Sequence, residues 1–159
     1  MTSGTFERAV LNTPSFYDFC EANGYSINNV ITSKQFEGDK EKFSISTISK
    51  NGLIDPQFDE NIPKGSGIVK TVLPFSFVEG SAMVMVYAPP NTVVENHSHT
   101  KGFFRFVYLG EYTFTGLPGG EIRLMTGEWI YIPKNTTYGY RAGPYGGGGG
   151  CCYCTNRGR

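Results

Sequence analysis

The residues best suited to do chemistry are the two histidines of the chain, His97 and His99, which are separated by one serine. In a β-strand, residues two apart point to the same face, so this spacing places both imidazoles side by side. Two neutral imidazoles make half of a metal site, because imidazole suits iron, nickel, copper or zinc. The simpler interpretation is a pair of surface histidines near a turn.

The residues around this pair resemble the first motif of the cupin superfamily. That motif runs from a glycine through five residues to His-x-His, then to a glutamate and, six residues later, to a second glycine. Here Gly110 stands in the closing glycine position, and Asn91 replaces the first glycine. Asparagine is a mild replacement because it also tolerates a positive φ. Phe103 stands where the family has its glutamate.

The second motif of the family is a glycine, five residues, a proline, and then a glycine, a histidine and an asparagine. Gly127 and Pro133 match it with the right gap. The other three positions hold Asn135 for the glycine, Tyr138 for the histidine and Ala142 for the asparagine. The resemblance covers about residues 80–142. It implies an all-β fold, a cupin-type double-stranded β-helix or jelly-roll barrel.

Two of the family's metal ligands are replaced, so other side chains must complete any metal site. Glu95 lies two residues before His97 and shares the face of both histidines if the strand runs unbroken. A carboxylate with two histidines is a ligand set of non-haem iron. The alternative for Glu95 is an exposed charge at the barrel rim. Tyr138 is expected to act as a ligand, an acid or an aromatic wall, and Tyr140 is a further candidate on its face.

Arg105 lies two residues after Phe103 and therefore shares its face of the strand. In one strand phase it points into the barrel, where a guanidinium is costly to bury without a partner. We expect that partner to be Glu95, Glu111 or an anionic group of a substrate. In the opposite phase Arg105 is an ordinary surface residue.

The spacing of turn residues predicts one short helix followed by strands. Thr13 and Pro14 at one end and Gly24 at the other suit a helix start and end. Gly110 and the segment 117–120 predict hairpin turns. Short apolar runs predict strands over 43–48, 67–73, 82–88, 93–99, 103–109, 111–115, 121–125, 129–132 and 138–141.

The length of 159 residues predicts a single domain over 1–150, with an N-terminal extension over 1–64 and a barrel core over about 65–142. Five consecutive glycines, Gly146 to Gly150, predict a mobile tether, because glycine loses the most backbone entropy when it is ordered. Residues 143–159 would then form a Gly/Cys-rich tail. Its three cysteines lack the spacing of a zinc knuckle, and we expect them to be inert or redox-sensitive.

Charge and hydropathy argue against two classes of partner. The 14 acidic and 14 basic residues balance, and no basic stripe is present to neutralise nucleic-acid phosphates. No apolar stretch approaches the roughly 20 residues that span a bilayer. Glu7 and Arg8 lie where a secretory signal needs its apolar run. We expect a cytoplasmic protein with a small-molecule partner and, from the family resemblance alone, a homodimer.

The resemblance implies a small-molecule metalloenzyme, with a dioxygenase as the first expectation. His97 and His99 would hold a divalent metal, helped by Tyr138 or Glu95, and Arg105 would orient a small oxygenated or acidic substrate. Iron is the first choice of metal, and zinc, manganese and nickel are alternatives. One competing function is a metal-free isomerase or epimerase that uses histidine and tyrosine as base and acid. Another is a non-catalytic module whose aromatic pocket holds a ligand.

Overall fold

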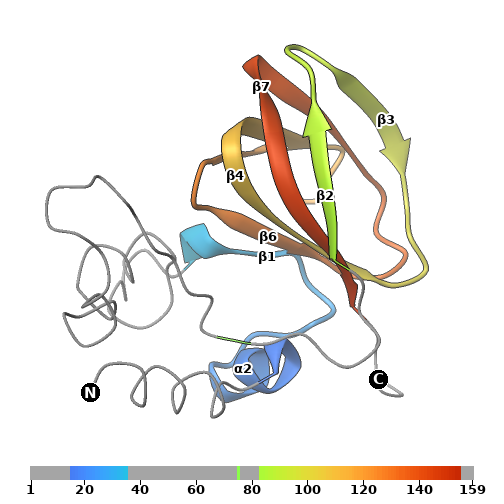
Figure 1. The fold of residues 1–159 in the computed structure, drawn as a ribbon. Helices are drawn as coiled ribbons and strands as arrows, with labels where there is room; N and C mark the ends of the chain where they lie inside the picture. The colour runs from blue at the N-terminus through green and yellow to red at the C-terminus, as the bar shows by residue number, and fades with distance from the viewer. Residues whose placement is uncertain (1–14, 36–74, 76–82, 155–159) are drawn as a thin grey trace, which may run out of the picture.

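The computed structural model describes residues 15–35, 75 and 83–154 of the chain. These residues contain one short α-helix and seven strands (Figure 1). The elements are α2 (Phe16–Ala22), β1 (Ile31–Thr32), β2 (Met83–Ala88), β3 (Val93–His97), β4 (Gly102–Thr115), β5 (Ile122–Met125), β6 (Trp129–Ile132) and β7 (Tyr138–Cys154). The strands expected over 43–48 and 67–73 lie outside the described residues. No helix in these described ranges is long and apolar enough to cross a membrane.

The described strands form one antiparallel sheet in the order β1-β6-β4-β7-β2, with β5 paired to β4 and β3 paired to β7. The long strands β4 and β7 each take part in two halves of this sheet. In one half, the start of β4 pairs with β6 and with the end of β7. In the other half, the end of β4 pairs with β5 and with the start of β7. The sheet ends at β1 and β2, so the described strands do not close into a complete barrel.

The main hydrophobic cluster contains side chains from both halves of the sheet. Phe103 and Ile130 come from one half, and Leu124 and Tyr138 come from the other. The two halves therefore pack face to face, which is the arrangement of a jelly roll. The predicted fold class, all-β with a cupin-type jelly roll and a short N-terminal helix, is confirmed.

A second cluster holds helix α2 against the outer face of the sheet. Phe16 packs edge-on against Trp129, with ring centroids 6.1 Å apart. The helix is capped by Ser15, whose hydroxyl accepts a hydrogen bond from the Asp18 amide at 3.1 Å. The expected cap, Thr13, lies outside the described residues.

Gly110 was expected to form a hairpin turn, and this prediction is wrong. It lies inside β4, where the register with β7 shifts between Gly110 and Tyr112. Gly110 and Gly146 both have left-handed backbones, with φ of 63° and 85°. A Cβ atom on Gly110 would collide with the Gly146 carbonyl. The two glycines thus let both long strands bend together from one half of the sheet into the other.

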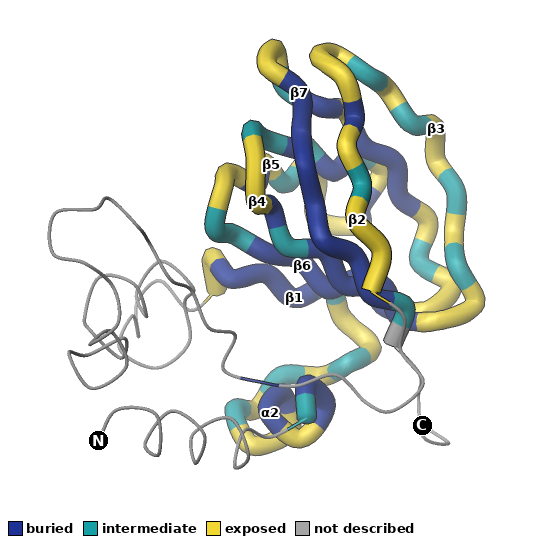
Figure 2. Tube along the Cα trace, viewed as in Figure 1, coloured by how far each residue is buried: buried dark blue, intermediate teal, exposed yellow. Residues whose placement is uncertain are grey.

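The mobile tether expected from Gly146 to Gly150 is also wrong. All five glycines are buried inside β7, and Gly147 to Gly150 pair with β2 on one side and β4 on the other (Figure 2). Rings from β4 cover the bare backbone, since Tyr108 lies over Gly148 and Phe106 lies over Gly150. Residues 143–154 therefore belong to the sheet and not to a tail outside it.

Other boundaries follow the predictions closely. The strand over 129–132 is confirmed, the strand over 121–125 begins one residue later than expected, and β2 covers the described part of the strand over 82–88. The runs 103–109 and 111–115 are a single strand, and the run 138–141 is the start of β7. The predicted hairpin turn over 117–120 is confirmed by a hydrogen bond of 3.0 Å from the Gly120 amide to the Leu117 carbonyl.

Candidate acid–base site

The structure brings His97, His99 and Tyr138 together at one end of the packed half-sheets. His97 is the last residue of β3 and lies opposite Tyr138, the first residue of β7. Their ring centroids are 4.7 Å apart. His99 lies in the loop that leads to β4, and its Nε2 is 3.1 Å from the Tyr138 hydroxyl. Tyr138 therefore occupies the place expected from its position in the second motif.

Phe103, which replaces the family's glutamate, completes this group. Its ring is stacked near His99 and Tyr138, with centroid distances of 5.7 and 5.6 Å. The ring of Tyr153 adds a further contact with His99 at 5.0 Å. The positions that hold the four metal ligands in the family thus converge here, but one of them carries the apolar ring of Phe103 and another the phenol of Tyr138.

The backbone of both motifs has the conformation that the resemblance implies. Asn91 and Asn135, which replace family glycines, both have φ of 60°, and they are the non-glycine residues with positive φ in the described segments. Gly110 and Gly127, at the matching glycine positions, have φ of 63° and 91°. All four positions are left-handed, so asparagine serves here because it tolerates this region. The Asn135 amide also donates to the His99 carbonyl at 2.7 Å, which ties the second motif to the site.

Burial keeps the central pair neutral. Tyr138 is 1% exposed, and removal from water raises the pKa of its hydroxyl. The pKa of His99 is lowered, first by burial and then by the positive charges of His97 and Arg105. A neutral imidazole next to a neutral phenol shares one hydrogen bond, through which a proton can pass between them.

His97 is held by a backbone contact. Its Nδ1 lies 2.8 Å from the Glu95 carbonyl oxygen. Since a carbonyl oxygen only accepts, the Nδ1 atom carries the proton and donates it. The Nε2 atom of a neutral His97 is therefore the nitrogen with a free lone pair.

The carboxylate of Glu95 does not join the histidines. The condition for a shared face was an unbroken strand, but the pairing of β3 with β7 is irregular between Val94 and His97, and β3 ends before His99. Glu95 is exposed. Within the described segments, no three His, Cys, Asp or Glu side chains are grouped so that they could hold a metal. The described His, Cys, Asp and Glu side chains thus make no three-ligand group by themselves, and a third ligand beside the two histidines would have to come from another residue type such as Tyr138.

Arg105 points into the interior between the two half-sheets, as one of the two strand phases predicts. It is 4% exposed, and its Nε donates to the Cys151 sulfur at 3.0 Å. The expected carboxylate partners are elsewhere: Glu111 is bound to Arg123, and Glu95 is exposed. Tyr140 lies here too, 4.5 Å from the guanidinium carbon, and not beside the histidines.

Cys151 is the interior residue that the sequence prediction missed. Because the glycine run before it predicted a mobile tether, no strand was expected at this position. The signal was the alternation after that run, because Gly147, Gly149, Cys151 and Tyr153 occupy every second position of β7. With that phase, Cys151 is expected on the face that Arg105 shares.

Comparisons with known proteins give matches among solved structures. A cupin superfamily protein from Desulfitobacterium hafniense has a TM-score of 0.44 and 11% identity, over 52% of this chain and 73% of that one. A cupin protein from Bacteroides fragilis has a TM-score of 0.43 and 22% identity, over 51% and 70%. A DMSP lyase from Ruegeria pomeroyi has a TM-score of 0.46 and 19% identity, over 52% and 42%.

No family model matches this chain. The curated proteins give no match either. The structure itself shows a left-handed backbone at four motif positions. It also shows two half-sheets packed face to face. On these grounds the described chain has the cupin-type, all-β fold that its motifs predict.

Proposed function

We propose that this protein is a small-molecule enzyme that moves a proton at a carbon next to a carbonyl group, as isomerases and epimerases do. The observation that carries the proposal is the 3.1 Å contact between His99 Nε2 and the Tyr138 hydroxyl in an aromatic surrounding. A base and an acid must both lie within hydrogen-bond reach of the substrate, and here they also lie within reach of each other.

In this mechanism His99 is the base and Tyr138 is the acid. Neutral His99 takes the proton from the α-carbon, which leaves an enolate and an imidazolium. Tyr138 donates its hydroxyl proton to the enolate and becomes a phenolate. The imidazolium then returns a proton to the phenolate through their direct contact, so that both groups regain their starting forms.

The burial of Tyr138 and the partial burial of His99 support the same assignment. Burial favours the neutral base and the neutral acid, which are the two forms that the first step needs. The stacked ring of Phe103 supplies a flat apolar wall beside both groups.

The test is exchange of carbon-bound protons with heavy water. Small ketones, aldehydes and 2-oxo acids are incubated with the protein in D2O, and loss of the α-proton signal is followed by NMR. We expect catalysed exchange that falls by about 100-fold or more in both His99→Gln and Tyr138→Phe. Exchange that persists in both variants would contradict the proposal.

Tyr145→Phe is the matched control for Tyr138→Phe. It removes one hydroxyl from a tyrosine of the same strand, β7, that is 86% exposed. We expect its exchange rate to equal that of the unmodified protein. Equal losses in both tyrosine variants would show that the effect is not specific to the site.

The second candidate is a metalloenzyme of the dioxygenase type, and one observation favours it. The contact of His97 Nδ1 with the Glu95 carbonyl fixes the ring and leaves Nε2 as the donor, as in many metal-ligating histidines. A metal would also need His99 and the Tyr138 oxygen. Elemental analysis of protein purified without an affinity tag tests this: one metal ion per chain, lost in His97→Ala, favours the second candidate over the first.

A further inference from the structure

The guanidinium of Arg105 is a buried cation with an incomplete set of partners. The residue is 4% exposed, and its Nε donates to Cys151. Its Nη1 atom is buried and has no hydrogen-bond partner within the part of the chain that the structure describes. A guanidinium carries five N–H donors, and leaving one of its nitrogens unpaired in a protein interior is costly.

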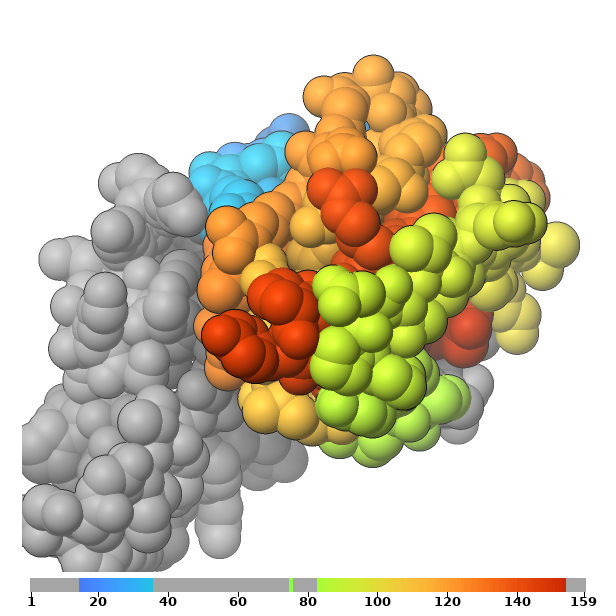
Figure 3. Space-filling view, turned by 90° about the horizontal axis from the view of Figure 1, so that it is seen from above, coloured from blue at the N-terminus to red at the C-terminus, as the bar shows by residue number. Residues whose placement is uncertain are grey.

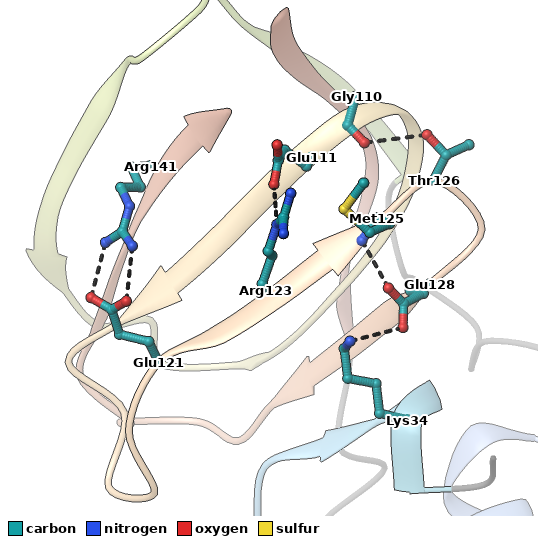
Figure 4. A network of polar contacts seen from close by, with 9 residues as sticks. All are labelled: Lys34, Gly110, Glu111, Glu121, Arg123, Met125, Thr126, Glu128 and Arg141. Atoms are coloured by element: carbon teal, nitrogen blue, oxygen red, sulfur yellow. Dashed lines mark hydrogen bonds and ion pairs between the residues drawn. The ribbon is translucent and has the colours of Figure 1, made fainter. Parts of the chain in front are cut away.

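Three acidic residues of the described chain pair with cations other than Arg105 (Figure 4). Glu111 is bound to Arg123, and Glu121 holds Arg141 through two contacts of 2.8 and 2.9 Å. Glu128 pairs with Lys34 at 3.2 Å (Figure 4). None of these carboxylates is available to Arg105.

Cys151, the hydrogen-bond partner of Arg105, does not supply a negative charge at neutral pH. Burial raises the pKa of the Cys151 thiol above its ordinary value, even though Arg105 beside it acts in the opposite direction. Cys151 therefore stays a neutral thiol. Among the described residues, the interior between the half-sheets holds one positive charge with no negative charge to balance it.

Four aromatic rings surround this charge. The guanidinium carbon lies 4.5 Å from the ring centroid of Tyr140, 4.8 Å from Tyr112, 5.1 Å from Phe103 and 5.7 Å from Phe114. Contacts between a cation and ring faces stabilise the cation in part. However, these rings do not offer a group that accepts two hydrogen bonds from the N–H donors in the plane of the guanidinium.

The backbone of β7 is shaped to admit the arginine. A Cβ atom at Gly149 would lie 2.9 Å from both Cγ and Cδ of Arg105. Glycine at this position therefore lets the side chain lie flat against the strand. The place of Arg105 is built by its neighbours and is not an accident of a loose loop.

We propose that Arg105 binds the carboxylate of a small, planar monocarboxylic acid held between the two half-sheets. One carboxylate balances one guanidinium, and its two oxygens match the fork of donors that Arg105 leaves unused. The aromatic rings around it suit a flat apolar body.

This inference rests on the proposed function and names its substrate class. Phe103 touches both sites, because its ring lies under the Arg105 guanidinium and beside His99 and Tyr138. An acid whose carboxylate binds Arg105 would thus direct a carbonyl group, a few bonds from that carboxylate, toward His99 and Tyr138.

The experiment compares the binding of benzoate, benzamide and inorganic phosphate by titration calorimetry on the full chain at pH 7. Benzoate and benzamide have the same shape and differ in charge. We expect benzoate to bind about tenfold or more tightly than benzamide, since hydrogen bonds to charged groups are the stronger ones. Equal affinity for the two, no binding of benzoate, or a preference for phosphate overturns the proposal.

Variants locate the binding. We expect Arg105→Gln to remove the preference for benzoate and Arg105→Lys to keep only part of it, because lysine has the charge without the fork. Arg123→Gln, which removes an arginine from the exposed face, should keep the full preference. A preference retained in Arg105→Gln overturns the assignment. If neither Arg105 variant folds, the comparison of the three probes on the unmodified protein still decides.

Failure of this inference is separable from failure of the proposed function. Binding of benzoate requires no proton transfer, so His99→Gln should bind benzoate as the unmodified protein does while its exchange activity is lost. If His99→Gln binds benzoate without preference over benzamide, the anion site is not at Arg105.

Discussion

The proposed chemistry depends on one contact between two residues, the 3.1 Å hydrogen bond between His99 Nε2 and the Tyr138 hydroxyl. The position of Tyr138 in the second motif predicted its place beside the histidines, because motif spacing fixes where each strand residue points. The partner of Arg105 was not predictable, since Cys151 lies 46 residues away in the chain, beyond a glycine run. Glu95 was expected on the same face as the histidines, but the local irregularity of β3 follows from pairing with β7 and not from the sequence of β3 itself.

The pH dependence of exchange follows from the pKa shifts of the pair. The charges and titratable groups that face His99 are His97, Arg105, Tyr138 and Tyr153. Burial, His97 and Arg105 all disfavour the imidazolium, so the base form should persist below pH 6.5, the ordinary pKa of histidine. Burial also disfavours the phenolate, so the acid form of Tyr138 should persist above pH 10. We expect a plateau of kcat/KM between these limits. An acid limb centred above 6.5 would show that His99 is not the base.

The left-handed asparagines can be tested one residue at a time. Asn91 has φ of 60°, a region that costs an ordinary L-residue roughly 1–2 kcal/mol. We expect Asn91→Ala to lower the free energy of unfolding by about 1 kcal/mol and Asn91→Gly to leave it nearly unchanged. Asn29→Ala is the control, because Asn29 is exposed and its φ is not positive. Urea unfolding of the three variants measures the difference, and equal effects of Ala and Gly at position 91 would refute the explanation.

Among the secondary-structure elements, β7 is the strand that is hardest to predict from the sequence. The sheet nevertheless depends on it. A run of five glycines carries no strand propensity of its own, and its order comes from hydrogen bonds to β2 and β4 and from the rings that cover it. Short apolar runs predicted β2, β3, β4, β5 and β6, whereas the two-residue strand β1 was not expected. The predicted break at Gly110 failed for a related reason: the bend needs Gly146 of β7, a contact distant in sequence.

Because aromatic rings pack on the glycine run, adding one methyl group to a glycine of this run should lower the stability of the protein. A Cβ at Gly150 would collide with the ring of Phe106. We expect Gly150→Ala to destabilise the protein by about 1–3 kcal/mol through overpacking. Gly119→Ala is the matched control, because nothing lies within 4 Å of a Cβ at Gly119 and its φ is not positive. Thermal unfolding compares the two variants. If Gly150→Ala is as stable as the unmodified protein, Phe106 does not cover the strand.

At the scale of the whole molecule, the exposed edge of the sheet bears on the expected homodimer. Strand β2 ends the described sheet and forms part of the surface seen in Figure 3. Its side chains Met83, Met85 and Tyr87 are 52%, 62% and 54% exposed and carry no charge. An exposed apolar edge strand tends to pair with another chain.

A homodimer through β2 is therefore our prediction for the assembly. Light scattering coupled to size exclusion should give twice the chain mass of 17.5 kDa. Met85→Lys places a charge on the edge and should shift the protein toward monomer. Met125→Lys, at a residue that is 43% exposed on β5, should remain a dimer. A monomeric unmodified protein would contradict the prediction.

In the proposed reaction, His99 and Tyr138 move protons without help from a metal ion. The most direct measurement is the rate of α-proton exchange into heavy water after exhaustive dialysis of the protein against a chelator. We expect the rate to be unchanged by the dialysis and by later addition of iron, manganese, nickel or zinc. A rate that disappears on dialysis and returns with one of these metals would contradict it.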